Sequence, residues 1–249
     1  MKLYILNCGQ MITPDDNILA KFNTPLLRLV LPVPVYLLEH PTQGLILIDT
    51  GFCYPRLPEE MKAGIAWSPI LQIKNQIASL GYDPEDVKHV LLSHLHFDHA
   101  GQIEDFPKAV FHLRKSEWDS ARACPSPDYF PEDYMGAKDF RLSFVPENED
   151  VDLFDDGTVF CLDTKGHSAG HQSFVIALPR TGKVLLSMDA AHLPAYFDSE
   201  DFFQDAWNPA LCVQAIEKIQ RVRKECALTI LGHDPAMWAF VRRAPEYYD

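Results

Sequence analysis

The densest group of potential metal ligands lies in the segment 93–101, where three histidines and an aspartate occupy six positions. His94 and His96 are two residues apart, so on an extended backbone both imidazoles project to the same side and can meet one metal ion. Asp98 and His99 follow, and they need a turn to face a second ion. Two ions about 3.5–4 Å apart recur in hydrolytic sites. The spacing therefore favours a hydrolytic metal centre over a surface histidine cluster or a structural single-metal site.

An apolar run precedes this segment. It extends from Val87 to Leu92 and is broken only by Lys88 and His89, a length that suits a buried strand better than a helix. The candidate ligands would then follow the carboxyl end of a strand, where open α/β sheets commonly place their sites. Gly101 comes just after them, and its missing side chain predicts a sharp turn of the backbone.

Other candidate residues also follow apolar strands. Asp49, Asp189 and His233 each end such a run, and His167 lies in a loop between two runs. A single histidine at a strand end is more often structural, but the segment 93–101 supplies only part of two coordination shells, so the fold must bring further nitrogen or oxygen ligands. Asp49 is expected either to cap a turn or to hydrogen-bond a ligating histidine or the motif loop.

The remaining pattern predicts strands, two good helices and two irregular regions. We expect strands over 2–6, 35–39, 45–49, 110–113, 158–162, 171–178, 184–188 and 227–231. Helices are expected from Ser68 to Gly81 and from Asn208 to Cys226, with a shorter one over 115–122. The proline-punctuated region 11–34 is expected to cover the core or to form one wall of an apolar substrate pocket. The insert 124–144 is expected to be irregular and to overhang the site.

Composition limits the class of protein. A chain of 249 residues with 47% apolar content can bury a large core, and we expect one domain over 1–249. The net charge of −13 and a pI of about 5.1 argue against nucleic acid and anionic membranes as partners. The six cysteines have no C-x-x-C spacing, and neither a signal peptide nor a membrane-spanning run is recognisable, so a cytoplasmic protein is expected.

The combined pattern resembles the metallo-β-lactamase superfamily of binuclear hydrolases over essentially the whole chain, and within it the N-acyl homoserine lactonases (quorum-quenching lactonases). The closer resemblance is carried by the segments 2–4, 47–51, 93–101, 166–173, 189–190, 232–234 and 245–247. It implies an α/β fold, the four-layer αβ/βα sandwich of two mixed sheets flanked by helices, with the site on one edge between the sheets.

The resemblance also implies a ligand set for two Zn²⁺ ions, although other divalent transition metals suit the same ligands. The first ion would be held by His94, His96 and His167, the second by Asp98, His99 and His233, and Asp189 would bridge the two. The aspartate at 189, where β-lactamases of the superfamily use cysteine, argues against antibiotic hydrolysis. His96, where the di-iron flavoproteins have a carboxylate, argues against that redox role.

The implied reaction is opening of the lactone ring of a small-molecule N-acyl homoserine lactone by a metal-bridging hydroxide, with Asp98 orienting the nucleophile and shuttling its proton. The chain departs from these lactonases at one position. It has His192 three residues after the bridging aspartate, where they carry a tyrosine whose hydroxyl reaches the substrate carbonyl. His192 is expected to donate a hydrogen bond to the developing oxyanion, to mark another substrate, or merely to pack.

Alternative functions keep the metal site and change the reaction. They are another lactonase, a thioesterase of the glyoxalase II type, a phosphoesterase and a mononuclear iron dioxygenase. A ligand-binding module without catalysis is a third class, and an RNA-processing nuclease is disfavoured by the acidic charge. Monomer and homodimer both stay open.

Overall fold

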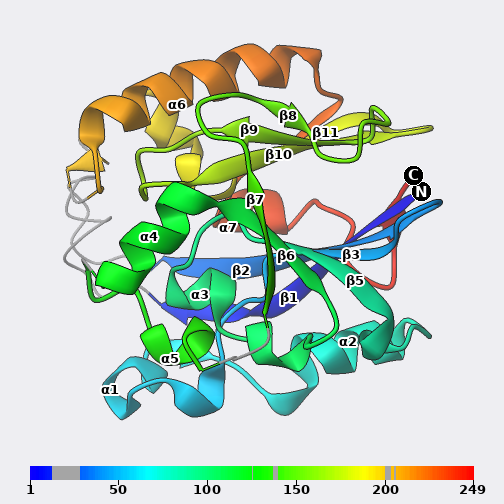
Figure 1. Ribbon diagram of the computed structural model, residues 1–249, viewed down its shortest axis with the longest axis vertical. Helices are drawn as coiled ribbons and strands as arrows, with labels where there is room; N and C mark the ends of the chain where they lie inside the picture. The colour runs from blue at the N-terminus through cyan, green and yellow to red at the C-terminus, as the bar shows by residue number, and fades with distance from the viewer. Residues whose placement is uncertain (13–28, 125, 137–139, 200–202, 205) are drawn as a thin grey trace.

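The computed structural model of the protein describes residues 1–12, 29–124, 126–136, 140–199, 203–204 and 206–249. Two β-sheets face each other between outer helices (Figure 1). Helix α6 (Pro209–Val222) covers the outer side of the smaller sheet, and α2 (Ile73–Ser79) packs outside the larger sheet. The expected αβ/βα sandwich of two mixed sheets is therefore confirmed.

The larger sheet has the strand order β13-β1-β2-β3-β5-β6-β7, with β4 paired to β1. Its strands are β1 (Lys2–Ile12), β2 (Val30–His40), β3 (Gly44–Ile48), β4 (Ile65–Ala66), β5 (Val87–Leu91), β6 (Val110–Arg114), β7 (Arg141–Val145) and β13 (Tyr247–Tyr248). Strands β3, β5, β6 and β7 are parallel. The carboxyl ends of β3 and β5 therefore lie at one edge of the sheet, where Asp49 and the segment 93–101 begin.

The smaller sheet has the order β12-β11-β10-β9-β8. Its strands are β8 (Val151–Asp152), β9 (Val159–Asp163), β10 (Gln172–Leu178), β11 (Gly182–Leu186) and β12 (Leu228–Ile230). Only β11 and β12 are parallel, so their carboxyl ends deliver Asp189 and His233 to the same place.

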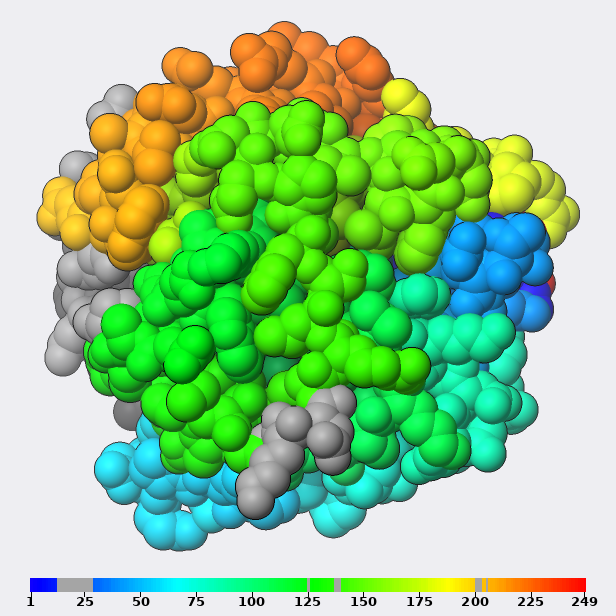
Figure 2. All heavy atoms as spheres, viewed as in Figure 1, coloured from blue at the N-terminus to red at the C-terminus, as the bar shows by residue number. Residues whose placement is uncertain are grey.

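Short helices complete the fold. They are α1 (Glu59–Lys62), α3 (Phe97–Ala100), α4 (Lys115–Ala123), α5 (Pro131–Tyr134) and α7 (Pro235–Trp238). Figure 2 shows the middle third of the chain, coloured green, covering most of the near face between α6 and the N-terminal helices.

Among the described residues, none of the helices combines the length and apolar character needed to cross a membrane.

The core explains why β2 and β3 read as continuous apolar runs. Leu37 and Leu47 point toward α2, whereas Leu38 and Ile46 point into the space between the sheets, and all four are fully buried. Both faces of these strands are thus covered, and each buried aliphatic side chain stabilises the fold by roughly 1.5–3 kcal/mol.

Two expectations about the elements were wrong in detail, and the structure adds detail to a third. The helix expected from Ser68 to Gly81 is interrupted at Gln72, whose ψ of 132° is extended, so a 3₁₀ turn over Pro69–Leu71 precedes α2. Residues 141–144, expected to be irregular, lie in β7. In the region 11–34, residues 30–34 belong to β2, where Pro32 and Pro34 are tolerated because only β1 pairs with that stretch.

Gly101 follows α3 for a reason other than a sharp turn, because its φ of −65° and ψ of −23° are ordinary helical values. A Cβ at this position would lie 2.4 Å from the backbone nitrogen of Cys53 and 2.7 Å from the Cα of Phe52. The small residue is therefore required by the close approach of two backbones.

Replacement of Gly101 by alanine is expected to destabilise the fold by about 1–3 kcal/mol, because neither backbone can move away easily. Urea unfolding followed by circular dichroism measures this change. Gly136→Ala is the control, since the nearest atom to its added Cβ is the flexible Glu104 carboxylate at 3.3 Å. Equal unfolding midpoints for the two variants would refute the explanation.

Candidate metal centre

The seven side chains predicted as metal ligands converge at one edge of the sandwich. Four come from the segment after β5, one from the β9–β10 loop, and one each from the ends of β11 and β12. Four groups have potential ligand atoms that all lie within 4.8 Å of one another: His94, His96 and His167; Asp98, His99 and His233; His94, His99 and Asp189; and His167, Asp189 and His192. The first two groups are the triplets that the resemblance implies, and the third connects them.

Asp189 occupies the middle of the cluster. Its Oδ1 lies 3.3 Å from Nε2 of both His99 and His233, and its Oδ2 lies 3.4 Å from Nε2 of His167 and 3.9 Å from Nε2 of His94. Burial alone would raise the pKa of Asp189, but the surrounding imidazoles, His99 foremost, hold it well below its usual value. The carboxylate is therefore ionised and faces both triplets.

Asp49 makes hydrogen bonds to the segment 93–101, which is one of the two roles expected for it. Its Oδ2 accepts hydrogen bonds from His99 Nδ1 and Ser93 Oγ, both at 2.7 Å, and its Oδ1 accepts one from the Ser93 backbone N–H at 2.7 Å. Because the Ser93 proton goes to Asp49, the Ser93 oxygen accepts from His94 Nδ1 at 2.9 Å. One buried carboxylate therefore sets the orientation of two imidazoles.

In His94 and His99, Nδ1 makes the hydrogen bond and Nε2 faces the cluster without one among the described residues. His233 follows the same rule, because its Nδ1 donates to the carbonyl of Pro32 at 2.8 Å. Nε2 of His94, Nε2 of His99 and Oδ1 of Asp189 are buried and have no hydrogen bond in the part of the chain that the structure describes. Buried polar atoms rarely stay unpaired, and a metal cation satisfies such lone pairs. The residues present fit a metal centre.

The protonation states differ between the two triplets. Burial lowers the pKa of His96 to about 4 and holds the pKa values of His94 and His167 well below the usual range. Burial alone would raise the pKa of Asp98, but His99 and His233 lower it to about 2. Burial alone would lower the pKa values of His99 and His233, but the neighbouring carboxylates, Asp189 foremost, raise them. Metal ions bind neutral imidazoles and ionised carboxylates, so these two histidines must release a proton when an ion binds.

Replacement of Asp49 by asparagine is expected to weaken zinc binding about 10–100-fold, because the amide cannot accept from both Ser93 and His99 as the carboxylate does. Competition with a chromophoric chelator measures the change. Asp119→Asn, on the exposed side of α4, is the control. Unchanged zinc affinity in the Asp49 variant would show that Asp49 serves only the turn.

His192 lies beside the cluster. Its Nε2 is 3.0 Å from Oδ2 of Asp189, and its ring centroid is 5.4 Å from that of His167 and 5.1 Å from that of His233. Its Nδ1 is 2.8 Å from the hydroxyl of Tyr196. The Nε2 side of His192 therefore faces the proposed metal ligands, while Tyr196 holds its Nδ1 side.

Sequence reasoning gave no role to His171, which the structure places under Asp189. The Asp189 backbone N–H donates to His171 Nε2 at 3.0 Å, and His171 Nδ1 donates to the carbonyl of Thr164 at 3.1 Å. Burial lowers the pKa of His171 to about 3, so the ring is neutral and can accept. The sequence signal that could have predicted a role near the site is its position four residues after the proposed ligand His167.

The regions expected to flank the site are described in part. Residues 13–28 of the expected pocket wall, and residues 125 and 137–139 of the expected overhanging insert, lie outside the described residues. Within the insert, the carbonyl of Asp128 accepts from the Phe97 N–H at 2.8 Å, and the ring of Tyr129 lies 4.6 Å from that of His96. This part of the insert therefore packs on the metal-binding segment.

Comparison with known proteins agrees with this geometry. The family model described as "Metallo-beta-lactamase superfamily" matches residues 28–209. The N-acyl homoserine lactonase AttM of Agrobacterium fabrum is 35% identical, over 100% of this chain and 98% of that protein. The N-acyl homoserine lactonase AiiA of Bacillus thuringiensis subsp. kurstaki is 30% identical, over 99% of this chain and 98% of that protein.

Solved structures give the same result. An N-acyl homoserine lactone hydrolase with the product N-hexanoyl-L-homoserine bound at its catalytic metal centre is similar with a TM-score of 0.82 and 30% identity, over 99% of this chain and 98% of that chain. AidC, a dizinc quorum-quenching lactonase, shares the fold with a TM-score of 0.69 and 18% identity, over 98% of this chain and 92% of that chain.

Proposed function

This chain belongs to the metallo-β-lactamase superfamily, and on that premise we propose that it is a metal-dependent hydrolase that opens the lactone ring of N-acyl homoserine lactones and so quenches quorum signals. The observation that carries the proposal is the convergence of seven histidine and aspartate side chains around Asp189. The lactonases at 30–35% identity over nearly their whole length support the choice of substrate.

We infer that the site holds two zinc ions, with other divalent transition metals as substitutes. His94, His96 and His167 would hold one ion and Asp98, His99 and His233 the other, with Asp189 contributing to both. When bound, such ions supply Lewis acidity, which polarises a carbonyl oxygen and lowers the pKa of water toward neutrality.

Asp98 is the proposed proton carrier. Its Oδ2 lies 3.5 Å from His99 Nε2 and 3.6 Å from His233 Nε2, the other two members of the second triplet. Held ionised, it can accept a hydrogen bond from the attacking water, orient that water, and pass its proton to the ring oxygen that leaves. The products are then the carboxylate and the free hydroxyl of the opened lactone.

His192 is the proposed donor to the oxyanion. Burial raises the pKa of the Tyr196 hydroxyl, which therefore keeps its proton and can donate to Nδ1 of His192. That hydrogen bond places the imidazole proton on Nε2, the nitrogen next to Asp189. An N–H held there stabilises negative charge on a carbonyl oxygen as the ring opens.

Titration at constant pH tests the substrate. We expect acid release from homoserine lactones with short and long acyl chains to exceed that from a simple γ-lactone or a thioester, with two zinc ions per chain by elemental analysis. A preference for the thioester would point to a glyoxalase II type of activity. One iron per chain with oxygen uptake would replace the proposal by a dioxygenase.

A further inference from the structure

Glu117, in the first turn of α4, is a buried acidic residue that the proposed reaction does not use. Its exposed fraction is 0%, and none of the ion pairs in the described part of the chain includes it. A buried carboxylate without a cation is costly unless hydrogen bonds compensate its charge. Burial raises the pKa of Glu117, and hydrogen-bond donors oppose that shift. The identity of those donors indicates what the residue does.

Four donors surround the carboxylate, two on each oxygen. The Leu95 N–H and the Tyr129 hydroxyl donate to Oε1, both at 3.0 Å. The Ser168 hydroxyl donates to Oε2 at 2.6 Å, and the Gly170 N–H donates to the same oxygen at 2.9 Å. Donors from three separate segments therefore share one side chain.

Each of these segments carries or contacts a histidine of the first triplet. Leu95 lies between His94 and His96, and Ser168 follows His167 directly. Tyr129 forms a backbone bridge with His96 in addition to the contact between their rings. Glu117 thus connects the two loops that must meet for His94, His96 and His167 to face one ion.

The second triplet is held by other groups. His99 donates to Asp49 and His233 donates to the Pro32 carbonyl, as described above. Glu117 contacts neither of these two histidines through the hydrogen bonds of the described residues. Asp49 supports both triplets, because it also orients His94 through Ser93, whereas Glu117 supports only the first.

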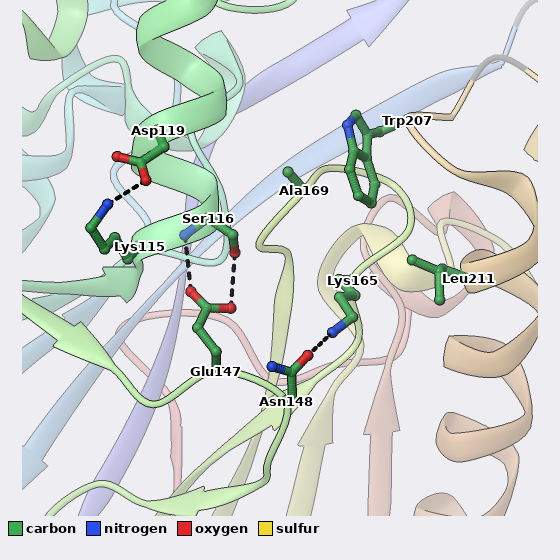
Figure 3. Close-up of a pocket in the computed structure, with 9 residues that line it drawn as sticks. All are labelled: Lys115, Ser116, Asp119, Glu147, Asn148, Lys165, Ala169, Trp207 and Leu211. Carbon is green, nitrogen blue, oxygen red and sulfur yellow. Dashed lines mark hydrogen bonds and ion pairs between the residues drawn. The ribbon is translucent and has the colours of Figure 1, made fainter.

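Close packing keeps the β9–β10 loop against α4. A Cβ at Gly170 would lie 2.5 Å from the Glu117 backbone nitrogen and 2.6 Å from its Cβ. The outer side of this junction is the pocket in Figure 3, lined by Ser116 and Ala169, the sequence neighbours of Glu117 and Gly170. In that pocket Glu147 accepts from the Ser116 backbone N–H at 2.9 Å and from its hydroxyl at 3.0 Å.

We propose that Glu117 is a positioning residue that fixes the first triplet and thereby sets the affinity of one of the two metal sites selectively. The inference rests on the proposed metal centre. Loss of an outer hydrogen-bond partner typically lowers metal affinity about 10–100-fold. That loss is expected at the site of His94, His96 and His167, whereas the other site keeps its affinity.

The test is Glu117→Gln, which keeps the shape of the side chain. Each carboxylate oxygen accepts one backbone N–H, so in either orientation the amide NH₂ faces a donor that cannot rotate away. Glu147→Gln is the matched control, because it makes the same chemical change on an exposed carboxylate that accepts from Ser116. Tyr129→Phe and Ser168→Ala each remove one hydroxyl donor and keep the carboxylate.

The readouts are stepwise Co²⁺ titration of the metal-free protein by visible absorption and zinc content after equilibrium dialysis, with circular dichroism to verify folding. We expect wild type and Glu147→Gln to bind two equivalents tightly, and Glu117→Gln to bind one tightly and the other 10–100-fold more weakly. Tyr129→Phe and Ser168→Ala should weaken the same single equivalent, and they decide the matter if Glu117→Gln does not fold.

Two results would overturn the inference while wild type still binds two ions. These are unchanged affinity for both equivalents in Glu117→Gln and the hydroxyl variants, or equal weakening of both equivalents. Fewer than two equivalents in wild type would instead contradict the proposed two-metal centre, and the selective role of Glu117 with it. The two failures are thus distinguishable.

Discussion

Replacement of Asp189 by alanine is expected to abolish lactone hydrolysis and to release metal from both sites. The carboxylate lies within 3.4 Å of Nε2 of His99, His233 and His167, so its loss removes the group that both triplets share. The activity should fall by more than the 10–100-fold typical of outer-shell changes. The substitution would also leave the imidazoles of His99, His233 and His167 without their shared negative charge.

Elemental analysis and titration at constant pH measure the two effects together. Asp198→Ala is a suitable control, because it removes an exposed carboxylate only nine positions away in the sequence. An Asp189 variant that keeps two zinc ions and measurable turnover would exclude Asp189 as the shared ligand.

Replacement of His192 by alanine is expected to lower kcat about 10²–10³-fold while the metal content stays the same, because it removes the proposed oxyanion donor and none of the seven proposed ligands. His192→Tyr, which restores a hydrogen-bond donor, should retain more activity than His192→Ala. Tyr196→Phe should have a smaller effect, because it removes only the hydroxyl that holds Nδ1.

These variants separate three roles for His192. Wild-type turnover in His192→Ala would mean that the ring merely packs against Asp189. Loss of one zinc ion would mean that Nε2 is itself a ligand, which its 3.0 Å distance from Asp189 Oδ2 also allows geometrically. Only the reduced kcat with full metal content fits an oxyanion donor.

The sequence predicted which side chains converge at the candidate metal centre, because potential ligand residues there directly follow apolar strands. The spacing of His94, His96, Asp98 and His99 is local, and the apolar run before it placed these residues at a strand end. Asp189 and His233 also follow apolar runs, but only the parallel pairing of β11 with β12 shows that they emerge side by side. That pairing joins segments about 40 residues apart, which periodicity does not reveal.

The residues that hold the proposed ligands in place were harder to predict from the sequence. Glu117 lies in an amphipathic helix whose pattern gives no sign of its donors, since these come from three other segments. The sequence predicts that Gly101 serves a sharp turn, whereas the structure requires it for the space beside Cys53. Tertiary contacts of this kind are set by the packing of distant segments, which no local pattern encodes.

The bare nitrogens that face inward at the sheet edge also link folding to metal supply. A ligand that binds only the folded state stabilises it by about 2.7 kcal/mol when its free concentration is a hundred times the dissociation constant. That is a large share of the roughly 5–15 kcal/mol by which proteins are stable. Depletion of the proposed metal ions would therefore reduce the folded population of this protein, so that its abundance would follow the metal supply independently of any lactone that it hydrolyses.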